Sequence, residues 1–192
     1  MKENKVKAIL IPAVSLLIIC VVVTALLGVT NSVTAPKIEQ LAAETEAAAK
    51  QAVLTDAVSF SEEKQIEKDG NAYTYYEGFS AEESTVGYVF RTSAKGYGGD
   101  IAVMVGVKTD GTVAGVNILS ISETAGLGMN ATNESFLSQF LGKSGTIGVL
   151  KNGSSETEIQ ALTGATITSK AMASAVNQAL ALFETVGGAQ NG

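Results

Sequence analysis

The sequence predicts an α+β protein in which a single N-terminal transmembrane helix precedes a domain with an antiparallel sheet packed against helices. Three observations predict this class. An apolar stretch near the N-terminus is long enough to cross a membrane, and a series of short β-type runs follows it. A long amphipathic segment comes last, and strands followed by a final helix are typical of an α+β domain.

The apolar stretch covers roughly 22 residues, from residue 8 to residue 29, and as a helix it would cross the hydrocarbon core of a bilayer. Lys2, Lys5 and Lys7 precede it, and the positive-inside rule keeps such a basic end in the cytoplasm. We therefore expect a cytoplasmic N-terminus over residues 1–7 and a transmembrane helix over residues 8–30. The bulk of the chain would then lie on the extracytoplasmic side of the cell membrane.

A cleavable signal peptide is the alternative interpretation, because it also combines a basic start with an apolar centre. The apolar stretch is too long for one, and the small-residue site Val33-Thr34-Ala35 is followed by Pro36, which we expect to disfavour cleavage. Cys20 is a poor lipoprotein site, since it follows the bulky residues Ile18 and Ile19. An uncleaved anchor is the favoured interpretation.

Residues 31–56 are expected to form a helical connector between the membrane and the domain. Pro36 opens a segment rich in Ala, Glu, Gln and Lys, which are strong helix formers, and this segment extends to about Leu54. Its apolar residues form a broken stripe at helical spacing, namely Ile38, Leu41, Ala42, Ala49 and Val53. We interpret the connector as a stalk without a binding site.

The predicted domain covers residues 57–186. Short β-type runs separated by polar turns fill its first half, at residues 57–60, 72–76, 85–92, 101–107 and 113–120. The tetrapeptide Thr109-Asp110-Gly111-Thr112 is typical of a hairpin turn between the last two runs. Helices are expected at residues 133–141 and 169–186, and residues 187–192 are expected to be a flexible tail. The second helix has an apolar face, formed by Met172, Val176, Leu180 and Phe183.

The composition narrows the possible chemistry. Cys20 is the only cysteine, so the chain can form neither an internal disulfide nor a cysteine-ligated metal cluster. The chain has no histidine, which excludes Ser-His-Asp triads, histidine acid–base catalysis and the commonest zinc and haem ligands. If the chain does redox chemistry, an organic cofactor must carry it, and no metal site is predicted.

The charge of the domain excludes a further class of partner. Three of the 13 basic residues and one of the 19 acidic residues precede residue 31. The remaining chain therefore has 10 basic and 18 acidic residues and a formal charge of −8. Such an acidic chain is not expected to bind nucleic acid, which requires a basic surface.

The hexapeptide Thr163-Gly164-Ala165-Thr166-Ile167-Thr168 is the strongest candidate for a binding site. Gly164 and Ala165 let a backbone turn approach a ligand closely, and the free N–H groups of the helix that follows favour a phosphate. Thr166 and Thr168 place two hydroxyls at this turn. The alternative is an ordinary helix N-cap, and both can hold if Thr168 or Ser169 caps the helix while Thr166 is modified.

The sequence Thr-Gly-Ala-Thr before a helix resembles the flavinylation motif of the FMN-binding domain that is found in the RnfG family and in its relative NqrC. The resemblance implies that FMN is attached covalently to Thr166 through a phosphoester bond. It also implies that the neighbouring motif residues surround the cofactor; they are Thr163, Gly164, Ala165 and Thr168.

Two glycine-rich loops, at residues 95–100 and 123–128, would on their own be ordinary turns at strand ends. Their sequences Lys-Gly-Tyr-Gly-Gly and Glu-Thr-Ala-Gly-Leu-Gly resemble two further signatures of the same FMN-binding domain, in the same order along the chain. The apolar N-terminal helix followed by residues 29–34 also resembles RnfG. The resemblance places seven loop residues near the flavin: Tyr97, Gly98, Glu123, Thr124, Gly126, Leu127 and Gly128. The strand tyrosines are expected to be core residues instead; they are Tyr73, Tyr75, Tyr76 and Tyr88.

Two positions depart from the pattern of this family. Ala125 stands where the family usually has Pro, which should loosen the loop without removing a functional group. Gln160 stands six residues before Thr166, where the motif has an Asp that belongs to the pattern recognised by the flavin transferase. Glu158 lies nearby as a partial substitute for that Asp.

The resemblance implies a membrane-anchored electron-transfer flavoprotein subunit of an Rnf complex, which passes electrons between ferredoxin and NAD with coupled Na⁺ or H⁺ translocation. Its partners would be the membrane, the integral membrane and iron–sulfur subunits of the complex, and a flavin transferase for maturation. No residue is a candidate acid or base, so we expect a carrier within a translocase, without independent substrate turnover. Two alternatives stay open: an NqrC-type subunit of a quinone-reducing sodium pump, and a non-redox membrane-anchored assembly module.

Overall fold

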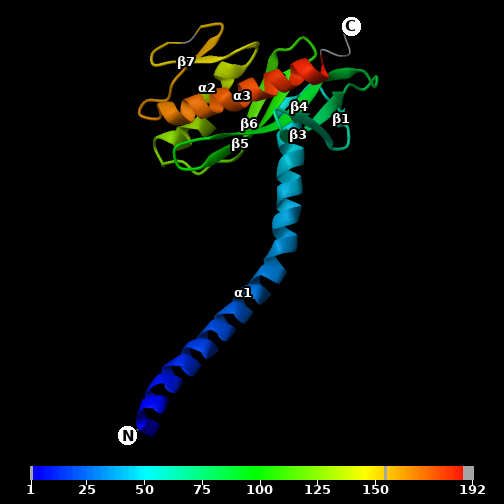
Figure 1. Ribbon diagram of the computed structural model, residues 1–192. Coiled ribbons are helices and arrows are strands. Elements are labelled where there is room, and N and C mark those ends of the chain that lie inside the picture. Colours follow the sequence, from blue (N-terminus) through cyan, green and yellow to red (C-terminus); the bar gives the residue numbers. More distant parts are fainter. Residues whose placement is uncertain (1, 154, 188–192) are drawn as a thin grey trace. The chain divides into compact units, whose positions relative to one another are not determined.

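The computed structural model describes residues 2–153 and 155–187, with side chains described from residue 10 onward (Figure 1). The chain divides into two compact units, one ending at Glu44 and one beginning at Thr45. Most of the tail predicted at residues 187–192 lies outside the described residues.

The N-terminal unit is formed by helix α1, which spans Lys2–Val53 and continues into the second unit. Among the described residues this is the one helix long and apolar enough to cross a membrane, with a mean hydropathy of 2.9 in its most apolar window. We predicted that Pro36 opens a helical segment, and this is wrong because Pro36 lies inside α1, as Pro12 does. A proline inside a helix removes one hydrogen bond and crowds the carbonyl four residues earlier, and α1 continues through both positions despite this cost.

Three hydroxyl groups of the N-terminal unit bond to the carbonyls of their own helix. Thr30 Oγ1 donates to Leu26 O at 2.9 Å, Thr34 Oγ1 donates to Thr30 O at 2.7 Å, and Ser32 Oγ donates to Val29 O at 2.9 Å. Such bonds satisfy polar groups within the helix itself. This part of α1 therefore suits an environment that offers few hydrogen-bond partners.

The second unit contains a six-stranded sheet in which every pair of neighbouring strands is antiparallel, as the sequence predicts. The strands are β1 Ser59–Phe60, β2 Lys64–Lys68, β3 Asn71–Phe79, β4 Thr85–Lys95, β5 Asp100–Lys108 and β6 Val113–Ser120. Their order is β1-β3-β4-β5-β6, and β2 also pairs with β3, toward the opposite end from β1. Strand β2 was not predicted, because its one apolar residue, Ile66, gives no alternating pattern.

The predicted turn between β5 and β6 is confirmed. Lys108 N donates to Thr112 O at 2.8 Å, and Gly111 has a φ of 82°, a conformation that favours glycine. Asp110 Oδ1 accepts from Thr112 N at 2.9 Å and from Thr112 Oγ1 at 2.6 Å. These bonds hold the pKa of the Asp110 carboxyl below its ordinary value, with the Thr112 hydroxyl as the largest cause.

Helix α3, Thr166–Val186, lies across one face of the sheet (Figure 1). Met172, Val176 and Leu180 are buried against it, as predicted, and the strands contribute alternate residues such as Phe90 and Val103. The predicted helix at residues 133–141 is instead two short turns, α2 Glu134–Leu137 and the 3₁₀ turn η2 Ser138–Phe140, which follow the 3₁₀ turn η1 Gly128–Thr132. A small parallel pair, β7 Gly148–Leu150 and β8 Glu158–Gln160, was not predicted because each strand has only three residues.

The opposite face of the sheet is covered by the last turns of α1. Ala49, Val53 and Leu54 pack there in a second buried cluster that includes Met104 and Val89. Strands β4 and β5 are therefore buried on both faces, and the apolar stripe of the predicted connector is used only at its C-terminal end.

A pair of glycines lets this helix end rest directly on the strands. Gly106 and Gly115 face each other across β5 and β6. A Cβ atom at Gly115 would lie 2.7 Å from Val53 Cα, and one at Gly106 would overlap the Val53 carbonyl. The close approach of α1 to the sheet thus requires glycine at both positions.

Candidate flavin-binding site

Three segments that are far apart in the sequence meet around one cavity of about 570 Å³. The first follows β4, the second follows β6, and the third is the start of α3. The lining residues are Tyr97, Glu123, Thr124, Leu127, Gly128, Gly164, Ala165, Thr166, Ile167 and Thr168. The fold therefore brings together three motifs that are separate in the sequence.

The carboxylate of Glu123 connects these segments. Its Oε1 accepts hydrogen bonds from the backbone N–H of Tyr97 at 2.7 Å and of Gly98 at 3.2 Å. Its Oε2 accepts from the Thr168 hydroxyl at 3.0 Å. One side chain thus fixes the loop after β4 to the first turn of α3, and it is the only charged residue in the lining.

Glycines make room for this carboxylate. A Cβ at Gly128 would lie 2.5 Å from Glu123 Oε2 and 2.7 Å from Thr168 Oγ1, and a Cβ at Gly96 would overlap Glu123 Oε1. Gly96 and Gly128 therefore serve close packing around the Glu123 side chain. This role follows from the three-dimensional structure and carries no separate signal in the sequence.

The turn before η1 explains the departure at Ala125. Leu127 N donates to Thr124 O at 3.1 Å, and Gly126, the third residue of the turn, has a φ of 75°. A positive φ at this position is the mark of a type II turn, in which proline is common at the second position. Ala125 occupies that second position, so proline would fit the backbone there.

The start of α3 differs from the prediction. The helix begins at Thr166, its N-cap is Ala165, and no side chain caps it, so the prediction of a cap by Thr168 or Ser169 is wrong. Both hydroxyls are inside the first turn and are used elsewhere. Thr168 bonds to Glu123, while Ser169 Oγ donates to Ala165 O at 3.0 Å and accepts from Leu162 N at 2.9 Å.

The first turn of α3 therefore has unused donors. Among the described residues, no hydrogen bond is made by the backbone N–H groups of Thr166, Ile167 and Thr168. Free N–H groups at the start of a helix of this length favour an anion, since the helix dipole adds to their partial positive charge. They adjoin the cavity, because the same three residues line it.

The two hydroxyls of the motif have different environments. The Thr168 side chain is 1% exposed and its hydroxyl is bonded to Glu123. Thr166 is half-buried at the cavity, and its hydroxyl makes none of the hydrogen bonds found among the described residues. Gly164, with a φ of 73°, forms the bend that places Thr166 at the helix start.

Exposed apolar side chains surround the opening of the cavity. Tyr97 is 73% exposed, Ile167 54% and Leu127 43%. Sequence reasoning named Tyr97 and Leu127 but missed Ile167, although an apolar residue between the two threonines of the motif was a usable signal. Thr163, Gly98 and Gly126 were predicted at the site and do not line the cavity.

The strand tyrosines are part of the core, as predicted. Tyr76 and Tyr88 are buried, and burial raises the pKa of each. Tyr73 and Tyr75 pack against the cluster between the sheet and α3, where the Tyr75 ring stacks on Phe90 at 5.9 Å between centroids. None of the four lines the cavity.

Gln160, which replaces the usual Asp, lies at the end of β8 with its side chain exposed. Its backbone N–H donates to Gln139 Oε1 at 2.7 Å. The carboxylate of Glu158, on the same strand, accepts from Ser155 Oγ at 3.1 Å. The exposed side chain at position 160 is therefore open to contact by another protein.

Comparison with known proteins decides the family. Residues 96–181 match the model of the FMN-binding domain, and residues 1–55 match the model of the RnfG N-terminal region. The G subunit of the Na⁺-translocating ferredoxin:NAD⁺ oxidoreductase complex of Acetobacterium woodii is 36% identical over 189 residues, with 89% of each chain covered. The chain belongs to the RnfG family. The matched domain includes all three segments that line the cavity.

Other members of the RnfG family are similar to a comparable degree. The G subunit of the proton-translocating ferredoxin:NAD⁺ oxidoreductase complex of Clostridium ljungdahlii is 35% identical, with 88% of this chain and 85% of that protein covered. The G subunit of the ion-translocating oxidoreductase complex of Methanosarcina acetivorans is 31% identical, with 87% and 90% covered. These relatives are subunits of ion-translocating oxidoreductase complexes, and this RnfG chain is accordingly an oxidoreductase subunit.

Solved structures show the same fold. NqrC of Shewanella oneidensis matches with a TM-score of 0.57 and 22% identity, covering 70% of this chain and 71% of that one. The C subunit of the Na⁺-translocating NADH-quinone reductase of Parabacteroides distasonis matches with a TM-score of 0.57 and 19% identity, covering 75% and 92%. The predicted α+β class is thus confirmed as an NqrC-like FMN-binding fold.

Proposed function

We propose that this chain is the membrane-anchored electron-transfer flavoprotein subunit of an Rnf complex and that it carries FMN covalently on Thr166. The complex would pass electrons between ferredoxin and NAD with coupled translocation of Na⁺ or H⁺. Both ions remain in the proposal because two relatives of nearly equal identity are named for different ions. The N-terminus would be cytoplasmic and the FMN-binding domain extracytoplasmic.

One observation supports the proposal: the Thr166 hydroxyl and three backbone N–H groups beside it have no hydrogen-bond partner in the described part of the chain, and they adjoin a cavity. The Thr166 hydroxyl would form the phosphoester bond. The N–H groups of Thr166, Ile167 and Thr168 would hold the remaining phosphate charge. A phosphate fits this place because no side-chain cap competes for the donors.

The rest of the lining suits the flat, mostly apolar ring of a flavin, which supplies the redox chemistry when bound. Tyr97, Leu127 and Ile167 offer apolar contact at the opening of the cavity. Glu123 holds the Tyr97 loop in place through two backbone N–H groups. A covalent bond to Thr166 would keep the cofactor in the domain regardless of its binding affinity.

The cavity offers no group suited to acid–base turnover of a substrate. Its one carboxylate, that of Glu123, already accepts three hydrogen bonds. A carrier needs only a held cofactor with an exposed edge, and the exposed side chains at the opening allow such an edge. The partners would be the integral membrane and iron–sulfur subunits of the complex, and a flavin transferase for maturation.

Denaturing gel electrophoresis tests the covalent cofactor. The full chain is expressed with a flavin transferase, and a fluorescent band that survives denaturation is expected. Thr166→Ala should abolish the band, whereas Thr168→Ala and the matched control Thr109→Ala, an exposed threonine in the β5–β6 turn outside the motif, should keep it.

Three other results would contradict parts of the proposed function. A dark band for the unmodified chain in transferase-competent cells contradicts covalent flavin and favours the non-redox assembly module. Fluorescence that persists in Thr166→Ala and vanishes in Thr168→Ala transfers the attachment site to Thr168. Co-purification with a quinone-reducing assembly, rather than with ferredoxin-dependent iron–sulfur subunits, favours the NqrC-type alternative.

A further inference from the structure

Strands β3 and β4 separate part of the way along their length. Their pairing ends at Thr74 and Arg91. Beyond that point β4 continues to Lys95 with β5 as its partner, and β3 continues to Asn71 with β2 as its partner. Among the described residues, no strand pairs with positions 92–95 of β4 on the side that faces β3.

Helix α3 contacts the hairpin of β2 and β3 where this hairpin leaves β4. Lys68 Nζ donates to Ala181 O at 2.6 Å, and Gln178 Nε2 donates to the Tyr73 hydroxyl at 2.8 Å. The Ala181 carbonyl and the Gln178 amide both belong to α3. Both contacts lie in the part of the β2–β3 hairpin that no longer pairs with β4.

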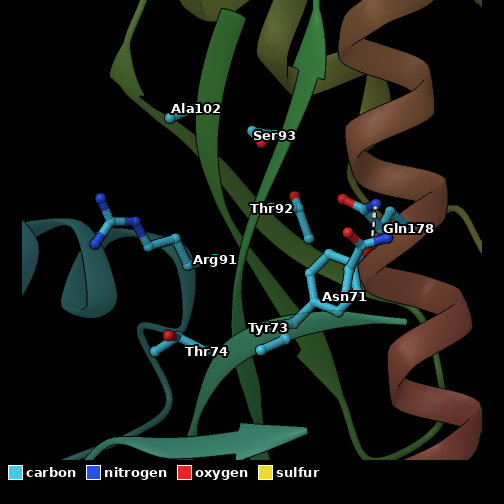
Figure 2. A pocket seen from close by; sticks show the side chains of 9 residues that line it. Asn71, Tyr73, Thr74, Arg91, Thr92, Ser93, Ala102 and Gln178 are labelled. Atoms are coloured by element: carbon cyan, nitrogen blue, oxygen red, sulfur yellow. Dashed lines mark hydrogen bonds between the residues drawn. The ribbon is translucent and has the colours of Figure 1, made fainter. Parts of the chain in front are cut away.

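A cavity of about 580 Å³ lies where the strands separate (Figure 2). It is lined by Asn71, Ala72, Tyr73, Thr74, Arg91, Thr92, Ser93, Ala102 and Gln178. Thr92 faces α3, because its hydroxyl donates to Ala175 O at 2.9 Å. Its neighbours Arg91 and Ser93 face the other side of the sheet, so the cavity is a gap between strands and not a groove on one face.

The lining is polar and has unused hydrogen-bonding capacity. It contains two amides, three hydroxyls of Ser and Thr, a phenol and a guanidinium. The buried Oε1 of Gln178 has no partner among the described residues, and a buried acceptor without one is unusual. Arg91 is half exposed and reaches Glu46 only at 3.7 Å, which leaves most of its donors unused.

We propose that this gap is a docking site for an extended segment of another subunit, which adds as a strand to residues 92–95 of β4. An unpaired strand edge presents backbone donors and acceptors in a row, and an added strand is the partner that satisfies such a row. The segment would place an acidic side chain near Arg91, with which a carboxylate can form paired hydrogen bonds. A small ligand would leave most of the strand edge unpaired.

This site is separate from the cavity at Thr166, because the two share no lining residue. The inference rests on the proposed function only in taking the partner from the subunits of an Rnf complex. It does not require bound flavin. Docking at this gap holds the domain in the complex through one end of its sheet and leaves its cofactor site open.

Hydrogen–deuterium exchange tests the strand pairing directly. The full chain is measured alone in detergent and within the purified complex. Amides at residues 92–95 on the unpaired edge should exchange about tenfold more slowly in the complex, since backbone pairing protects them. Exchange at equal rates in both samples overturns the proposal, and equal protection of the isolated chain at high concentration assigns the site to a second copy and also overturns it.

A blocking variant makes the test specific. Ser93→Trp fills the gap from an exposed position and should abolish the protection, whereas the matched control Glu82→Trp, at an exposed position in the β3–β4 turn, should keep it. A photo-crosslinking residue at Ser93 should capture one segment of one subunit of the purified complex. Protection that survives Ser93→Trp, or crosslinking to this chain itself, contradicts the proposal.

The two proposals fail in distinguishable ways. Ser93→Trp should leave the fluorescent flavin band unchanged, because Ser93 is not at the Thr166 cavity. A dark band together with slower exchange in the complex contradicts the covalent flavin and supports the docking site. A fluorescent band without slower exchange supports the covalent flavin and contradicts the docking site.

Discussion

At the residue scale, the carboxylate of Glu123 organises the candidate site by joining two of its segments. It accepts hydrogen bonds from Tyr97 N, Gly98 N and the Thr168 hydroxyl. Its presence in the motif follows from the sequence, but its partners do not, because they lie 26, 25 and 45 residues away along the chain. We infer that its main contribution is to the position of two segments.

We predict that Glu123→Ala lowers the free energy of unfolding by about 1–3 kcal/mol, since three donors lose their acceptor. Glu123→Gln should cost less, because an amide oxygen can still accept from the two backbone N–H groups. Denaturant unfolding of the full chain in detergent measures both. If Glu123→Ala unfolds at the same denaturant concentration as the unmodified chain, the three hydrogen bonds contribute nothing to stability.

Asp110 gives a prediction about pH. Hydrogen bonds from Thr112 lower the pKa of its carboxyl in the folded state. Its stabilising contribution is therefore fully present above the unfolded pKa of about 3.9 and is lost as the pH falls through the lower folded value. Thr112→Val, which removes the hydroxyl donor, should move the Asp110 pKa back up in an NMR titration. An unchanged pKa in that variant would show that the hydroxyl is not the cause.

At the scale of elements, the turn that contains Ala125 shows how one position can depart from a family pattern and keep its conformation. The φ of 75° at Gly126 and the bond from Leu127 N to Thr124 O define the turn without help from position 125. Proline at the second position would only restrict the unfolded chain. The present sequence has the same turn with less preorganisation.

We predict that Ala125→Pro raises the free energy of unfolding by about 0.4–1 kcal/mol. The N–H that proline removes is not used as a donor to any described residue. Thermal or denaturant unfolding measures the gain, and Ala125→Gly, which increases the freedom of the unfolded chain, is the opposite control. A loss of stability in Ala125→Pro would mean that the turn is not of type II.

At the scale of the whole molecule, the modification of Thr166 that we propose would require recognition by another protein. Gln160 replaces the Asp of the family motif, and its side chain is exposed at the end of β8. The Glu158 carboxylate on the same strand is bonded to Ser155 Oγ at 3.1 Å, so it is not a free substitute. Transferase recognition should therefore respond to position 160 itself.

We predict that Gln160→Asp increases the fraction of chains that carry flavin when the transferase is limiting. The exposed position allows the change without altering the core. In-gel fluorescence normalised to total protein measures the fraction, and Gln65→Asp, at an exposed position on β2 that does not line the Thr166 cavity, is the control. An equal fraction in Gln160→Asp and the unmodified chain would show that the transferase tolerates Gln160 fully.

The sequence predicts the parts of the fold whose patterns are local. Strands β4 to β6 are apolar runs rich in β-branched residues and bounded by turn signals, and the apolar face of α3 repeats at helical spacing, so both were predicted. Strand β2 has a single apolar residue and β7 and β8 are too short to show a period, so they were missed. The start of α3 was misplaced because Thr168 looks like a cap until its bond to Glu123 is known.

The motifs predicted which segments form the candidate site. The contacts between those segments could not be predicted from the sequence. Three glycine-containing segments carried the resemblance, and all three line one cavity. The functions of the individual glycines depend on contacts between segments, such as that of Gly128 with Glu123. The gap between β3 and β4 has no sequence signal, because the hairpin beside it is held by contacts with α3, more than 100 residues away along the chain.

The glycine pair beneath the end of α1 determines where the chain can be cut. A soluble fragment that starts at Ala57 would lose Ala49, Val53 and Leu54, and with them the apolar cover over Val89 and Met104. A fragment that starts at Thr45 keeps that cover and begins where the second compact unit begins. The last turns of α1 are thus a structural part of the FMN-binding domain, and cutting the chain at the predicted boundary would remove one wall of its core.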